Sequence, residues 1–215
     1  MTLGELEGRL RSLLGGPKPG GEAHVLLSPR PRPGWKPGRL PEESRPGAGL
    51  LLLYPQSGRA HLVLTVRAKH LPSHRGQVSF PGGAVEPDES IEEAALRESA
   101  EEVGVEPSRV RVLGLLTPLH IPASGYVLHP AVGAADERPD LRPAEGEVER
   151  ILEVPFDDVA DPTRLRTEPR LLRGETCLVP YFDLCGEKVW GATAMVLAEL
   201  LCLLGERPDP WRDAT

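Results

Sequence analysis

The segment GGAVEPDESIEEAALRESAEEVGV, residues 82–105, constrains the fold and the chemistry of this chain more than any other. Between Glu86 and Glu102 it carries eight acidic residues and one arginine, a local charge of −7 that equals the formal charge of the whole 215-residue chain. The rest of the chain is therefore close to neutral in sum. Such a concentration of charge on one short segment requires a physical reason.

The residue pattern of this segment predicts a helix from about Ile91 to Val103. Ser90 is a suitable N-cap, and Glu93 stands where its carboxylate can reach back to the cap. Gly104 is a natural C-terminal stop. The segment therefore contains signals for both ends of a helix.

Three glutamates of this helix fall on one face. Glu98, Glu101 and Glu102 are at i, i+3 and i+4, which places their Cβ atoms about 5–6 Å apart. Their like charges destabilise the helix, and the dipole at its C-terminal end is unfavourable to anions. A hard divalent cation would offset both effects, because carboxylate oxygens are the ligands that Mg²⁺ prefers. The alternative is an ordinary solvated acidic face.

The neighbouring residues favour a ligand site. Pro81-Gly82-Gly83 precedes the helix, and paired glycines let backbone approach a ligand closely. Glu89 stands eight residues before Arg97, about two helical turns away on a similar face. It could hold Arg97, which could in turn orient the carboxylates from a second layer.

Composition limits the class of protein. A chain of 215 residues with 40% hydrophobic residues suits one globular α/β domain with extensions. It has no apolar run near the ~20 residues of a membrane helix, and its N-terminus does not resemble a secretion signal, so we expect a cytoplasmic protein. A charge of −7 with few aromatic residues argues against a nucleic-acid surface. The three cysteines lack metal-type spacing and are interpreted as buried apolar thiols: Cys177, Cys185 and Cys202.

The remaining pattern predicts many strands and few long helices. Thr2 and Glu5 form a potential capping box for a helix that ends at Gly15-Gly16, and residues 16–48 are Pro- and Gly-rich and expected to be mostly irregular. Strands are expected at 49–54, 60–67, 77–80, 110–116, 127–134, 148–154, 176–182 and 184–189, a helical turn at 155–159 and a final helix at 192–204. This order predicts a mixed sheet flanked by helices.

The predicted organisation has three parts. Residues 1–45 form an N-terminal helix and arm, residues 46–205 the domain, and residues 206–215 a tail. The N-terminal helix could pack on the sheet or mediate a homodimer.

At this point the acidic segment resembles a known family. The segment matches the Nudix box, G-x5-E-x7-R-E-U-x-E-E-x-G-U, where U is a bulky aliphatic residue. The matching residues, in order, are Gly83, Glu89, Arg97-Glu98, Glu101-Glu102 and Gly104-Val105, separated by five, seven, two and one residues. Ser99 stands at one aliphatic position and removes no ligand. The resemblance implies a Nudix fold, an α/β/α sandwich around a mixed sheet, and hydrolysis of a nucleoside diphosphate linked to another group.

The resemblance also implies roles for individual residues. Glu98, Glu101 and Glu102 would bind Mg²⁺ or Mn²⁺, with the Gly83 carbonyl as a further ligand. Glu89 and Arg97 would support them. A diphosphate and a carboxylate cluster repel each other until metal ions bridge them.

The stretch LTVRAKHLPSHRGQVSFPGG, residues 64–83, adds a basic loop beside the acidic site. It could be a counter-surface for an anionic substrate, or an ordinary polar loop. Leu64-Thr65-x-Arg67-Ala68, Gly76 and Phe80-Pro81-Gly82-Gly83 resemble the additional motif of coenzyme A pyrophosphatases, although Pro72 replaces the second arginine of that motif.

This second resemblance extends over roughly residues 45–205. It implies cleavage of coenzyme A or its derivatives to 3′,5′-ADP and 4′-phosphopantetheine. The substrate-binding residues would be Arg67, His74, Arg75 and Gly82.

A general base must deprotonate the attacking water. The box glutamates are candidates, and the EGEVER segment offers Glu145, Glu147 and Glu149. We favour Glu147, which directly precedes a predicted strand. The alternative is a solvated acidic loop.

The roles of several other residues remain open. Trp190 is expected to open the final helix as a core or cap residue, with an adenine platform as the alternative, and Tyr126 could contact a nucleotide or pack within a strand. His120 and His129 are interpreted as core or surface histidines.

The competing functions are a Nudix pyrophosphatase acting on another conjugate such as ADP-ribose, and a catalytically silent Nudix-fold binding module.

Overall fold

Strand β1 (Arg45–Gln56) lies at the centre of the fold because its run of apolar residues is covered on both faces. Leu50, Leu52 and Tyr54 belong to one core cluster. The alternate residues Leu51 and Leu53 belong to a second cluster on the opposite face. Two separate cores on the two faces of one strand require covering layers on both sides.

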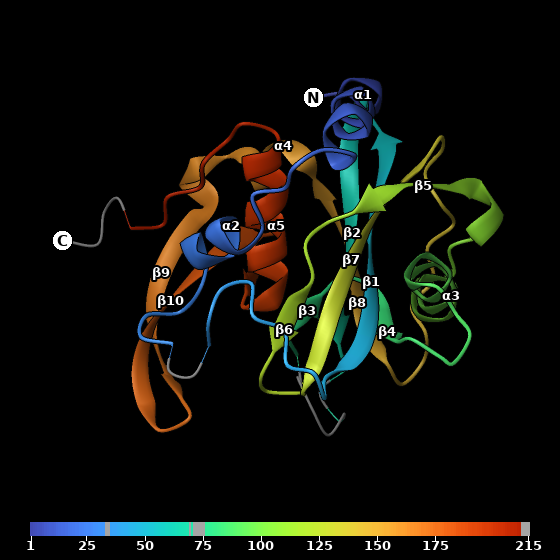
Figure 1. The fold of residues 1–215 in the computed structure, drawn as a ribbon. Coiled ribbons are helices and arrows are strands. Elements are labelled where there is room, and N and C mark those ends of the chain that lie inside the picture. The colour runs from blue at the N-terminus through green and yellow to red at the C-terminus, as the bar shows by residue number, and fades with distance from the viewer. Residues whose placement is uncertain (33–34, 69, 71–75, 212–215) are drawn as a thin grey trace.

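The computed structural model describes residues 1–32, 35–68, 70 and 76–211 (Figure 1). Its helices are α1 (Leu3–Leu14), α2 (Gly20–Leu26), α3 (Ile91–Val103), α4 (Phe156–Ala160) and α5 (Ala192–Leu203), with 3₁₀ turns η1 (Pro107–Arg109) and η2 (Pro162–Arg164). Besides β1, its strands are β2 (Arg59–Arg67), β3 (Val78–Ser79), β4 (Gly82–Ala84), β5 (Val110–Leu115), β6 (Leu119–Ile121), β7 (Tyr126–Ala135), β8 (Val148–Pro155), β9 (Leu165–Leu172), β10 (Glu175–Leu184) and β11 (Glu187–Trp190).

The main sheet is mixed. Strand β1 pairs in parallel with β7 and antiparallel with β2 and β4. Strands β8 and β3 pair with β2, and β5 and β6 pair with β7, all antiparallel. Strands β9, β10 and β11 form a separate antiparallel sheet. Helix α3 covers one face of the main sheet, and α1 and α5 contribute to the core of the other (Figure 1). The predicted α/β/α sandwich around a mixed sheet is confirmed.

Helix α5 is buried along almost its whole length, and it carries a buried acidic side chain. Glu199 accepts hydrogen bonds from the Thr117 N–H at 3.1 Å and the Thr117 hydroxyl at 2.6 Å, and it lies 2.9 Å from Nε2 of His24. These partners satisfy a carboxylate that would otherwise be costly to bury. The contact with His24 fixes α2 against α5.

Residues 16–48 are mostly irregular as expected, but they include helix α2, which was not predicted. Its Ala23 and His24 are buried, and Leu27 beyond its end belongs to the core. Strand β1 also begins at Arg45, earlier than expected. The Pro-rich composition concealed a short helix that tertiary packing stabilises. The proposed boundaries after residues 45 and 205 stay predictions.

Several other expectations have clear outcomes. Helix α3 has the predicted bounds and the predicted Ser90–Glu93 capping box, and Gly104 ends it in the left-handed conformation with φ 74°. Strands β4, β6 and β9 were not predicted, because they are short or lack a regular apolar alternation. Trp190 ends β11 instead of opening the final helix. Cys185 is exposed, and only Cys177 of the three cysteines is fully buried.

Across the described parts of the chain, no helix has both the length and the apolar character needed to cross a membrane.

Candidate active site

The three-carboxylate face of α3 lies beside the glycine turn before it. Glu102 is 3% exposed and accepts a hydrogen bond from the Gly82 N–H at 3.1 Å. Nη1 of Arg67 lies 3.5 Å from its other oxygen. Glu101, by contrast, has a largely exposed side chain. The face therefore runs from a buried carboxylate to a solvated one.

The two glycines of the turn are required by close contacts. A Cβ atom on Gly83 would lie 2.4 Å from the carboxylate of Glu98. A Cβ atom on Gly82 would lie 2.2 Å from the carbonyl oxygen of Ala48 in β1. Any side chain at either position would displace backbone or the glutamate, so the Gly-Gly pair allows β4 to pair with β1 while Glu98 lies against it.

Burial makes this carboxylate cluster electrostatically unfavourable. It raises the pKa of Glu102 to about 7, with the negative charges of Glu98 and Glu147 adding to the effect and the Gly82 N–H and Arg67 opposing it. Burial also raises the pKa of Glu98, against the opposing effect of Arg97. Because each carboxylate disfavours ionisation of the next, a cation at this position would be stabilising.

Arg97 organises the cluster as its spacing predicted. Nε and Nη2 of Arg97 donate to the two oxygens of Glu89 at 2.8 and 3.0 Å, and Nη2 also donates to the Ala84 carbonyl at 3.0 Å. Nη1 donates to Glu98 at 3.0 Å and lies 3.4 Å from Glu101. A bidentate pair of this kind has a fixed geometry. The contact between Glu89 and Arg97 is present, and the role of the pair in catalysis stays a prediction.

Ser99 also has a physical explanation. Its side chain is fully buried, and its hydroxyl donates to the Ala95 carbonyl one turn earlier at 2.7 Å. The serine thus packs at the aliphatic position of the box without leaving an unpaired polar group.

The donor atoms of these residues indicate whether the site fits a metal ion. Within the described ranges, no group of three or more His, Cys, Asp or Glu side chains already converges as a metal site. The available donors near Gly83 are nevertheless carboxylate oxygens, two of them on glutamates whose pKa is raised by burial. Hard oxygen donors with unfavourable mutual repulsion fit Mg²⁺ or Mn²⁺.

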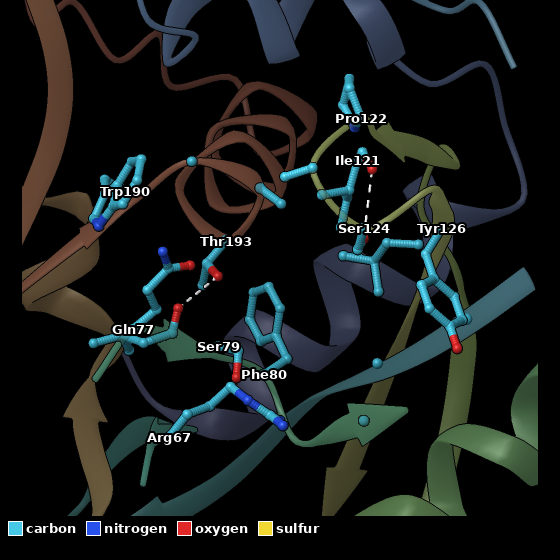
Figure 2. Close-up of a pocket in the computed structure, with 18 of the residues that line it drawn as sticks. Arg67, Gln77, Ser79, Phe80, Ile121, Pro122, Ser124, Tyr126, Trp190 and Thr193 are labelled. Atoms are coloured by element: carbon cyan, nitrogen blue, oxygen red, sulfur yellow. Dashed lines mark hydrogen bonds between the residues drawn. The ribbon is translucent and has the colours of Figure 1, made fainter. Parts of the chain in front are cut away.

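A cavity of about 940 Å³ extends from these carboxylates. Glu98, Glu102 and Glu147 line it together with Arg67 and Gly83. Figure 2 shows Trp190 and Tyr126 on opposite sides of this pocket, with Phe80 between them. The pocket therefore joins residues from both sheets to the acidic helix.

The sequence-predicted site residues have different outcomes. Arg67, Gly82, Gly83, Glu98, Glu102 and Glu147 line one pocket, while Glu89, Arg97 and Glu101 lie beside it through the contacts of Arg97. His74 and Arg75 lie outside the described residues, as does Pro72. Tyr126 belongs to β7 and also lines the pocket, so neither of its two interpretations is eliminated.

Sequence reasoning missed the far side of the pocket. Arg32 and Trp35 from the N-terminal arm line it, as do residues 171–173 at the tip of the β9–β10 hairpin. Neither segment has a periodic or motif-like pattern. They meet only in the folded chain, where Arg30 and Leu178 exchange two backbone hydrogen bonds of 2.9 and 2.8 Å.

Together, the mixed sheet and the carboxylate cluster define an α/β protein with an acidic candidate site in a large pocket. Residues 43–173 match the model of the NUDIX domain. The chain is 40% identical over 151 residues to the uncharacterized Nudix hydrolase NudL of Pectobacterium atrosepticum, an alignment covering 68% of this chain and 77% of that protein. It is 38% identical over 161 residues to the NudL protein of Escherichia coli O1:K1, covering 72% and 79%. The chain belongs to the Nudix hydrolase family.

Solved structures agree on the fold. The Nudix hydrolase RenU of M. smegmatis has a TM-score of 0.51 at 21% identity, covering 75% of this chain and 86% of that one. The MutT protein of Methanosarcina mazei Go1 has a TM-score of 0.51 at 16% identity, covering 79% and 100%. Membership of the family makes this chain a Nudix pyrophosphohydrolase of a nucleoside diphosphate-linked substrate, and the family typically uses a divalent metal.

Proposed function

We propose that this chain hydrolyses the diphosphate bond of coenzyme A or a derivative, giving 3′,5′-ADP and 4′-phosphopantetheine or its acyl form. One observation carries the proposal. Arg67 and the residues Phe80, Gly82 and Gly83, which belong to the coenzyme A pyrophosphatase-like motif, line the same cavity as Glu98 and Glu102. The two motifs are thus parts of one site.

The size and lining of the cavity support a large substrate. At about 940 Å³ it lies near the upper end of the range for small-molecule sites. Phe80, Leu128 and Ile121 supply apolar wall to the same cavity. Such a wall suits the uncharged arm of a pantetheine group better than a second sugar.

The diphosphate would contact two kinds of group, a metal ion held by carboxylates and the guanidinium of Arg67. Glu98, Glu101, Glu102 and the Gly83 carbonyl would hold Mg²⁺ or Mn²⁺, which when bound activates water and stabilises charge on the leaving phosphate. Arg67 would contact a phosphate oxygen, since its guanidinium lines the cavity beside Glu102. His74 and Arg75 remain proposed substrate-binding residues.

Glu147 is proposed as the general base. It precedes β8, lines the cavity, and is close enough to raise the pKa of both Glu98 and Glu102. A carboxylate in this position could accept the proton of a water that attacks the diphosphate. Glu89 and Arg97 would hold the box glutamates in place without contacting substrate.

A substrate panel tests the proposal. Purified protein is incubated with coenzyme A, ADP-ribose or a dinucleoside polyphosphate, with and without Mg²⁺ or Mn²⁺, and products are separated by chromatography. We expect metal-dependent release of 3′,5′-ADP from coenzyme A, faster than cleavage of ADP-ribose. Cleavage of ADP-ribose alone would retain the Nudix chemistry and reject coenzyme A. No cleavage of any conjugate would favour a binding module.

A further inference from the structure

The far side of the cavity carries two arginines from distant parts of the chain. Arg32 comes from the N-terminal arm, and Arg173 from the turn between β9 and β10. Both line the same cavity as the box carboxylates. A cavity with carboxylates at one end and guanidinium groups on another wall offers two different sites for charge.

Arg32 is held in place by groups that do not neutralise it. Its guanidinium lies 4.1 Å from the ring centroid of Trp35, and Nη1 lies 2.8 Å from the Sδ atom of Met195 in α5. An aromatic face and a thioether orient a guanidinium but carry no formal charge. Among the residues that the structure describes, no neighbour balances the charge of this half-buried arginine.

Arg173 is placed in the cavity wall by an unfavourable turn. The hairpin pairs Leu172 with Glu175, which leaves Arg173 and Gly174 as a two-residue turn with φ values of 52° and 83°. Glycine and asparagine are preferred where φ is positive, and arginine is disfavoured there. A disfavoured residue at a cavity wall is a reason to look for a functional role.

Neither arginine forms an ion pair with a carboxylate of the residues that the structure describes. Within the described residues no ion pair with an acid joins Arg32 or Arg173, although Glu175 lines the same wall. The two charges also oppose each other, since burial and then the charge of Arg173 lower the pKa of Arg32 to about 10. The charge of Arg32, after burial, likewise lowers the pKa of His120 in β6. This wall is thus a positive region that an anion would stabilise.

We propose that Arg32 and Arg173 form a second anion subsite, which binds a phosphate or carboxylate on the part of the substrate that is not cleaved. The proposal rests on the proposed function. In a coenzyme A-type substrate the anion can come from the phosphomonoester on the ribose or from a carboxylate at the end of an acyl group. Two arginines on one wall suit either group, because guanidinium forks pair with planar or tetrahedral oxyanions.

Ligand binding tests the subsite without catalysis. Isothermal titration with adenosine 3′,5′-bisphosphate and with AMP measures the phosphomonoester, and the same titration with malonyl-coenzyme A and acetyl-coenzyme A, without metal, measures the carboxylate. We expect wild-type protein to favour the more anionic member of at least one pair by about 10- to 100-fold. The Arg32→Gln, Arg173→Gln double variant should lose that preference.

Two further variants separate charge from folding. Arg32→Lys keeps the charge and should retain part of the preference. Arg30→Gln is the matched control, because Arg30 lies on the same arm but stacks on Trp211 at 3.9 Å instead of lining the cavity. It should bind both members of each pair like wild type. A preference that survives in the double variant, or the absence of any preference in wild type, would overturn the subsite.

Kinetics then distinguish the two proposals. The ratio of kcat/KM for coenzyme A over 3′-dephospho-coenzyme A, and for malonyl- over acetyl-coenzyme A, should fall toward one in the double variant. Hydrolysis of coenzyme A with ratios unchanged by the double substitution would reject the subsite and retain the proposed function. A binding preference that the double variant loses, in a protein that does not cleave coenzyme A, would retain the subsite and reject the proposed function.

Discussion

The acidic helix and the arginine wall face the same cavity, but they are built in different ways. Glu98 and Glu102 come from one turn of α3, next to the glycine turn that contacts them. Arg32 and Arg173 come from an irregular arm and a hairpin turn in separate parts of the chain. Local spacing therefore encodes the first region, and only tertiary packing brings the second together. If both proposals hold, the chemistry lies on the helix and substrate choice lies on the wall.

Removal of a helix carboxylate should have the largest effect on turnover. Glu98→Gln is expected to lower kcat about 10³-fold, because several kcal/mol of charge stabilisation would be lost with the metal. Steady-state product analysis by chromatography measures this. Glu92→Gln on the first turn of the same helix does not line the cavity and is the control. An equal loss of kcat in both variants would show that turnover depends on the integrity of the helix and not on the Glu98 carboxylate.

Substitution of the proposed base should have the next largest effect on turnover. Glu147→Gln is expected to lower kcat about 10²-fold and to remove the acidic limb of the pH–rate profile, since a glutamine cannot accept the proton. Glu145→Gln in the same loop, which does not line the cavity, should leave both unchanged. A variant of Glu147 with the wild-type pH profile would sink this assignment.

The electrostatic cost of the acidic region should be visible in stability. The pKa of Glu102 in the folded chain, about 7, lies above its ordinary value of 4.5, so the folded state binds more protons between these values. In metal-free protein this carboxylate therefore lowers the free energy of unfolding as pH rises from about 4.5 to about 7, and the loss is complete above that range. Glu102→Gln should consequently be more stable than wild type by roughly 2–3 kcal/mol at pH 8, and not at pH 4. Urea unfolding in the presence of a chelator measures the difference, which must vary with pH if the cause is correct.

The supporting arginine should have the smallest effect. Arg97→Lys keeps the positive charge but loses the bidentate pair with Glu89, so kcat should fall about 10-fold with little change in KM. A rise in KM without a change in kcat would place Arg97 in substrate binding and would weaken the distinction between the two regions.

The same contrast explains what could be predicted from the sequence. The capping box at Ser90, the bounds of α3 and the Glu89–Arg97 pair were predictable because each depends on residues a few positions apart. The buried run of β1 was predictable because continuous apolar residues indicate a strand covered on both faces.

Features that depend on distant partners were not predictable. Helix α2 is only seven residues long and is stabilised by contacts such as that of His24 with Glu199. Trp190 was misplaced by one element because its position depends on the pairing of β11 with β10. Arg32 and Arg173 carry no local signal at all, since neither belongs to a motif.

The most direct test of the account is the binding of Mn²⁺ to the acidic region. Electron paramagnetic resonance of free Mn²⁺, titrated with wild-type protein, Glu98→Gln and Glu92→Gln, measures how much metal each protein removes from solution. We expect saturable binding by wild type and the Glu92 variant, and binding at least about 10-fold weaker by the Glu98 variant. Equal binding by all three proteins would contradict the claim that the excess charge of this chain is gathered on α3 to hold a metal ion.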